Sequence, residues 1–105
     1  MESRLITHPD IDENTSKRKF LIVNATRAEV AILINQLVKH DPKFDFYIWS
    51  NDAPDEEWLL KVWNLVEFAL INKENALDLT NKDLDVKKVV KYNNLQELFK
   101  FIYDQ

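Results

Sequence analysis

The side chains suited to acid–base or nucleophilic chemistry are few in this chain of 105 residues. Its two histidines are His8, in a polar N-terminal segment, and His40, at the end of a predicted helix. A hydrolytic triad needs a serine, a histidine and an acid, and no spacing marks either histidine as the partner of Ser50. The histidines also lack the helical HExxH spacing that holds zinc. We therefore expect no catalytic residue, no metal site and no enzyme activity.

The absence of glycine and cysteine excludes further classes of site. Phosphate-binding loops of the GxGxxG or Walker type and the Gly-x-Ser-x-Gly nucleophile elbow need glycine, because their backbone takes a positive φ or approaches the ligand closely. Thiolate zinc sites, iron–sulfur clusters and cysteine nucleophiles need cysteine. We therefore expect no bound cofactor.

One location for a small ligand remains open. In an open α/β sheet, ligands collect beyond the carboxyl ends of the parallel strands. The polar residues predicted at that edge are Asn24, Thr26, Ser50 and Asp52. Thr26 and Asp52 also suit helix capping, which accounts for them without a ligand. A ligand-binding or enzymatic domain that uses this cleft is the alternative to the function favoured below.

Acidic and aromatic residues are concentrated in one short stretch. Residues 41–57 contain six acids and a single base, Lys43, and large rings lie in the same stretch and at Trp58. Interfaces favour Tyr, Trp and Phe at their desolvated centres, while acids on the rim steer a basic partner. We predict a partner-binding surface formed by Asp45, Tyr47, Trp49, Asp52, Asp55, Glu56, Glu57 and Phe68.

Phe68 joins this surface because of its place on a predicted helix. The pattern predicts a helix over residues 54–72, with an apolar arc of about 160° that faces the core. Leu60, Phe68 and Ile71 lie outside this arc, and Phe68 falls between Glu57 and Lys61 on the polar side. We expect exposed apolar residues here, which would also allow a homodimer or a larger homo-oligomeric structural subunit.

The net charge of −4 favours a protein partner over nucleic acid. We expect a small acidic protein-binding module, most simply an inhibitor or immunity-type neutraliser of a basic protein such as a toxin nuclease. The chain start lacks a signal-peptide pattern, and no segment approaches the roughly 18 uninterrupted apolar residues of a membrane span. We therefore expect a cytoplasmic protein with neither a nucleic-acid nor a membrane partner.

The elements that position these residues form one predicted α/β domain over residues 1–105. Residues 7–19 are polar and irregular, and Leu5 and Ile6 before them suit a short edge strand. The main elements are predicted as strand 20–23, helix 26–40, strand 44–49, helix 54–72, strand 76–80, strand 86–92 and a final helix from 94. This β-α-β-α-β-β-α order predicts three helices and a mostly parallel or mixed sheet of four or five strands.

The last two predicted strands leave one choice open. Residues 76–92 fit either two strands of the parallel sheet or an antiparallel hairpin with its loop at 81–85. Lys87, Lys88 and Lys91 lie in the final strand, and edge strands commonly carry lysine to discourage pairing with other chains. One of these two strands is therefore expected at the border of the sheet.

Overall fold

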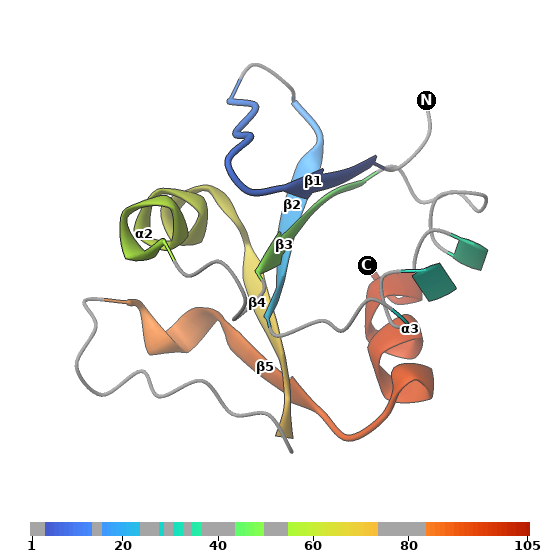
Figure 1. Ribbon diagram of the computed structural model, residues 1–105. Helices are drawn as coiled ribbons and strands as arrows, with labels where there is room; N and C mark the ends of the chain where they lie inside the picture. Colours follow the sequence, from blue (N-terminus) through green and yellow to red (C-terminus); the bar gives the residue numbers. More distant parts are fainter. Residues whose placement is uncertain are drawn as a thin grey trace.

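A parallel β-sheet forms the centre of the protein in the computed structural model (Figure 1). The structure describes residues 4–13, 16–23, 28, 31–32, 35–36, 44–49, 55–73 and 84–105. Within them, the sheet has five strands in the order β1-β3-β2-β4-β5, and all neighbouring strands run in parallel. The strands are β1 (Arg4–Thr7), β2 (Arg18–Val23), β3 (Phe44–Trp49), β4 (Phe68–Asn72) and β5 (Val89–Tyr92).

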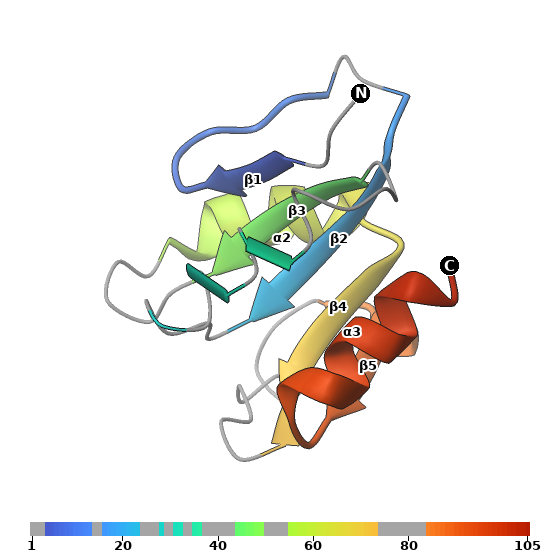
Figure 2. The same cartoon turned by 90° about the vertical axis from the view of Figure 1, so that its right-hand side faces the viewer.

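Helices cover both faces of this sheet. The helix α2 (Glu56–Leu65) lies on one face, and α3 (Leu95–Tyr103) lies on the other (Figure 1). A short 3₁₀ turn, η3 (Val86–Lys88), leads into β5. Figure 2 shows the strands side by side from β1 at one edge to β5 at the other. In the described part of the chain, no helix is both long and apolar enough to cross a bilayer.

Strand β3 shows why this sheet needs two covered faces. All six of its residues are buried, because successive side chains point to opposite faces and each face has its own core. Tyr47 and Trp49 pack with α2, whereas Phe44, Phe46 and Ile48 pack with α3. The same division applies to β2, whose Leu21 and Val23 face α2 while Phe20 and Ile22 face α3.

Much of the predicted architecture is confirmed. The protein is an α/β fold with a parallel sheet, and β2 and β3 cover the strands predicted at 20–23 and 44–49. Of the strand predicted at 86–92, β5 forms residues 89–92, while residues 86–88 form η3. β5 pairs in parallel with β4 and forms an edge of the sheet, with Lys91 exposed, as the lysine pattern predicts. The predicted strand at 76–80 lies outside the described residues, as does most of the predicted helix at 26–40.

The predicted helix over residues 54–72 is wrong in its second half. The helix α2 ends at Leu65, and Val66 takes an extended conformation as its C-cap. The backbone N–H of Glu67 then donates to the Lys19 carbonyl on β2 at 2.9 Å, and β4 begins at Phe68. The described order therefore has two α-helices and differs from the predicted order. Phe68 and Ile71 lie outside the apolar arc of the predicted helix because they belong to this strand and not to a helix. A short apolar run does not by itself separate a helix from a buried strand.

The segment before β2 is irregular for most of its length, as predicted for 7–19. It connects β1 to β2, which are separated by β3, so it crosses the sheet. It crosses on the side of α2, because Ile11 packs against the cluster that contains Trp58 and Leu59. This crossing brings polar residues of the connection over the start of α2.

Two substitutions test the change from helix to strand. Leu60 and Ile71 both lie outside the apolar arc of a continuous helix, but Ile71 in β4 is 2% exposed whereas Leu60 on α2 is 40% exposed. We expect Ile71→Ala to lower the free energy of unfolding by about 2–5 kcal/mol and Leu60→Ala by less than about 1 kcal/mol. Urea unfolding of both variants measures this difference, and equally small losses would contradict the assignment of β4.

Candidate protein-binding surface

A histidine and an aspartate meet where two neighbouring parallel strands end. His8 directly follows β1, and Asp55 is the N-cap of α2, the helix that follows β3. His8 Nε2 and Asp55 Oδ2 are 2.9 Å apart, and the other carboxylate oxygen, Asp55 Oδ1, accepts the backbone N–H of Trp58 at 3.1 Å. One carboxylate therefore caps the helix and ties the end of β1 to it.

Trp58 fixes the connection that follows β1. Its indole N–H donates to the Asp10 carbonyl at 3.1 Å, and the His8 ring makes an edge-on contact with the indole at a centroid distance of 5.6 Å. Ile11 packs on the apolar cluster that contains Trp58. Because buried tryptophan needs a partner for its indole N–H, this bond both satisfies the ring and holds the connection against α2.

Carboxylates from two segments gather around this contact. We define the acidic surface as Asp10, Asp12, Asp55, Glu56 and Glu57. Asp10 and Asp12 line one hollow, Asp55 and Glu57 line a second, and Ile11 borders both. The Nζ of Lys61 lies 3.8 Å from Glu57, so part of the negative charge is balanced locally.

Only part of the predicted surface lies here. Asp55, Glu56 and Glu57 are brought together at the start of α2, as predicted. Asp45, Tyr47 and Trp49 are instead buried on β3, and Trp58 is buried on α2. The expectation that these rings face outward is wrong, because β3 lies inside the sheet and both of its faces are covered.

Phe68 is also misplaced in the predicted surface. It lies half-buried in β4 and packs against the core on the α3 side, with its ring centroid 6.0 Å from that of Phe20 and 5.2 Å from that of Phe101. Asp52 lies outside the described residues, as do Asn24, Thr26 and Ser50 of the predicted ligand cleft.

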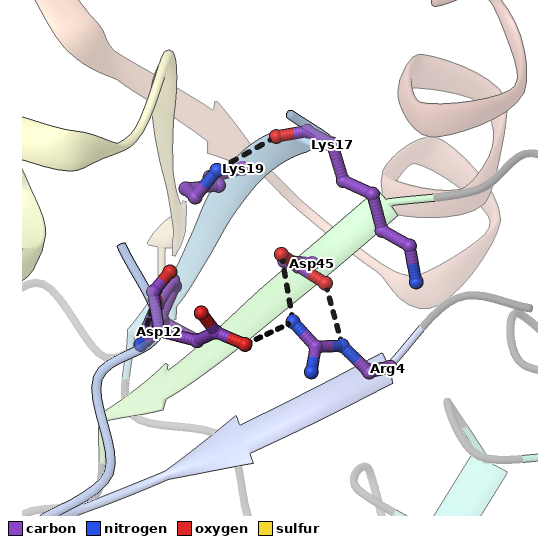
Figure 3. A network of polar contacts seen from close by, with 6 residues as sticks. Arg4, Asp12, Lys17, Lys19 and Asp45 are labelled. Carbon is purple, nitrogen blue, oxygen red and sulfur yellow. Dashed lines mark hydrogen bonds and ion pairs between the residues drawn. The ribbon is translucent and has the colours of Figure 1, made fainter. Parts of the chain in front are cut away.

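The buried carboxylate of Asp45 is part of a separate polar network (Figure 3). The Arg4 guanidinium donates from Nε to Asp45 Oδ1 at 3.0 Å and from Nη2 to Oδ2 at 3.1 Å. Arg4 Nη2 also donates to Asp12 Oδ2 at 3.1 Å. The strand register places Arg4 on one side of Asp45 and Lys19 on the other, so cationic residues flank the carboxylate across three strands.

Tyr47 joins this network to the connection. Its hydroxyl accepts the backbone N–H of Asp12 at 3.0 Å and donates to the carbonyl of Asp12 at 3.2 Å. Burial raises the pKa of Tyr47, and the hydrogen bonds with Asp45 raise the pKa of Arg4. The Arg4–Asp45 pair lies near the amino ends of the strands, away from the edge where α/β sheets bind ligands. The bond from Arg4 to Asp12 joins this pair to the acidic connection.

Three members of this arrangement were missed at the sequence level: His8, Asp10 and Asp12. The run His-Pro-Asp-Ile-Asp at residues 8–12 is dense in acids, but its place was undetermined without the pairing of β1 with β3. No group of three or more potential metal ligands occurs among the residues that the structure describes. Comparisons with protein-family models, curated proteins and solved structures gave no match for this chain.

The link between His8 and Asp55 makes a prediction about pH. The hydrogen bond from His8, together with that from the Trp58 backbone, holds the pKa of Asp55 below its ordinary value of 3.8. A lowered pKa in the folded state means that the stabilisation is present above the unfolded value and is lost as the pH falls through the folded value. We expect His8→Ala to raise the pKa of Asp55 toward 3.8, measured by NMR titration of its carboxyl carbon.

Glu97 provides the internal control for this titration. Its pKa is lowered chiefly by hydrogen bonds from Asn93, which do not involve His8. The pKa of Glu97 should therefore stay constant in His8→Ala. An unchanged pKa of Asp55 in the same variant would show that His8 does not hold this carboxylate in solution.

Proposed function

We propose that this chain is a protein-binding module that captures a basic protein through its acidic surface. In the specific form of this proposal, it is an inhibitor or immunity-type neutraliser of a basic toxin such as a nuclease. The observation that carries the proposal is the contact between Trp58 and Asp10, which joins acids from two distant segments into one surface.

The first argument for partner binding is that the backbone of the acidic surface is held in place by contacts within the protein. The acids of α2 lie in its first turn, and the connection is held to that turn by the indole bond and by the His8–Asp55 pair. Segments that are already ordered lose little conformational freedom when a partner docks, so more of the contact energy appears as affinity. This rigidity distinguishes the surface from a solvated acidic tail.

Charge is the second argument. Glu56 and Glu57 are exposed beside the N-cap Asp55, and Asp10 is exposed on the adjoining connection. Acids at the rim of a contact raise the association rate with a basic partner and make binding sensitive to salt. The rings beneath the surface, such as Trp58, are buried, so they hold the surface in place and do not contact a partner directly.

Charge reversal at one surface residue tests this function against a matched control. Glu57→Lys and Asp104→Lys change the net charge equally, but Asp104 lies at the C-cap of α3. Basic proteins captured from a lysate at low salt are identified, and their affinity for the purified wild type and both variants is measured by calorimetry. We expect one-to-one binding. Glu57→Lys should lower the affinity at least about fivefold, Asp104→Lys should change it by less than about twofold, and added salt should lower it.

The captured partner should also lose its own activity when bound. Capture of no basic protein, or equal weakening by Glu57→Lys and Asp104→Lys, would contradict the proposal. Retained partner activity in the complex would reject the inhibitor form and leave only the binding module.

A further inference from the structure

Strand β1 is an edge strand of unusual character. It pairs with β3 on one side, and no strand within the described ranges pairs with its outer side. The outer backbone groups of an edge strand are a template for another strand. The opposite edge, β5, carries the exposed Lys91 and follows Lys87 and Lys88, which is a common protection against such pairing.

On β1, in contrast, the cationic side chain is paired with carboxylates. Its single cationic residue, Arg4, is engaged by Asp45 and Asp12, and the remaining residues of the strand, Leu5 to Thr7, carry no charge. A side chain held in this way cannot repel an incoming basic chain as a free lysine would. The edge of β1 therefore lacks the exposed lysines that protect β5.

A hollow lies beside this edge. It has a volume of about 580 Å³ and is lined by Arg4, Leu5 and Ile6 from β1 and by residues 10–12 of the connection. The described part of the connection, residues 8–13, extends beyond β1 in both views (Figures 1 and 2). The hollow thus has backbone of an edge strand on one side and carboxylates on the other.

The charges around the hollow favour a basic ligand. Arg4 is paired with Asp45 and Asp12, so this trio carries a net negative charge, and the exposed Asp10 adds to it. The half-buried Leu5 and Ile11 provide apolar contacts for aliphatic side-chain stems. An extended segment with lysine or arginine at alternate positions matches both features, because the side chains of a strand alternate between two directions.

We propose that β1 accepts an extended basic segment of a protein partner as an added strand of the sheet. This inference rests on the proposed function and specifies how the partner binds. Main-chain hydrogen bonds to the outer edge of β1 supply affinity, and cationic side chains facing Asp10 and the acidic surface supply specificity.

Three synthetic peptides of equal charge test this mode of binding. The first alternates lysine and valine over ten residues, the second is the same peptide N-methylated at alternate positions, and the third places the same number of lysines in an alanine-rich helix. We expect the first to bind and to slow amide hydrogen exchange in residues 4–7 at least about tenfold. We expect the other two to bind at least about tenfold more weakly and to leave β1 exchange unchanged.

Variants of this chain locate the contact. Asp10→Lys should weaken binding of the alternating peptide at least about fivefold, whereas Asp104→Lys should change it less than twofold. Equal binding of all three peptides without protection of residues 4–7 would overturn strand addition, while the capture experiment above decides the proposed function separately. Failure of the alternating peptide to bind would likewise overturn strand addition, even if a basic protein were captured.

Discussion

The ion pair between Arg4 and Asp45 is the interaction on which the N-terminal half of the protein depends. Asp45 is fully buried on β3, and a buried carboxylate is tolerated only when its charge is paired and its oxygens are hydrogen-bonded. Arg4 meets both oxygens with a bidentate contact from the neighbouring strand. Such a contact fixes geometry as well as charge, so it selects the register in which Arg4 lies opposite Asp45.

The acidic surface follows from that register. Once β1 lies at the edge beside β3, its connection to β2 must cross the face that α2 covers, and Asp12 reaches both Arg4 and Tyr47 along the way. Trp58 then holds Asp10 above the helix start. A buried charge in the sheet thus places exposed charges on the surface, through the contacts of Asp12 with Arg4 and Tyr47 and of Trp58 with Asp10.

A local element can be predicted from the sequence where a single feature, such as an apolar run or a capping residue, determines it. The apolar run of β2 and the Asn94 cap of α3, which accepts the Glu97 backbone N–H at 3.0 Å, are of this kind. The break between α2 and β4 was missed because Phe68 and Ile71, which lie outside the apolar arc of the predicted helix, were interpreted as exposed apolar residues. A strand covered on both faces is apolar throughout, which accounts for both positions.

Predicting the site required knowledge of long-range pairing. The concentration of acids and rings in residues 41–58 predicts that Asp45, Tyr47 and Trp49 are exposed, although two large rings on one side of a strand also indicate a second covered face. Asp55, Glu56 and Glu57 were placed correctly because the helix start determines their exposure locally. Asp10 was missed because it joins them only through a crossing between strands that are not adjacent.

The most direct test of this account is a double-mutant cycle on Arg4→Met and Asp45→Asn, measured by urea unfolding. We expect a coupling free energy of about 1–3 kcal/mol, since each single change leaves a polar partner without its counterpart in the sheet. The exposed pair Arg18–Glu67, with an Nε–Oε2 distance of 2.7 Å, serves as the control and should couple by less than about 1 kcal/mol. Additive effects at Arg4 and Asp45 would contradict the claim that this pair holds β1, and with it the acidic surface, in place.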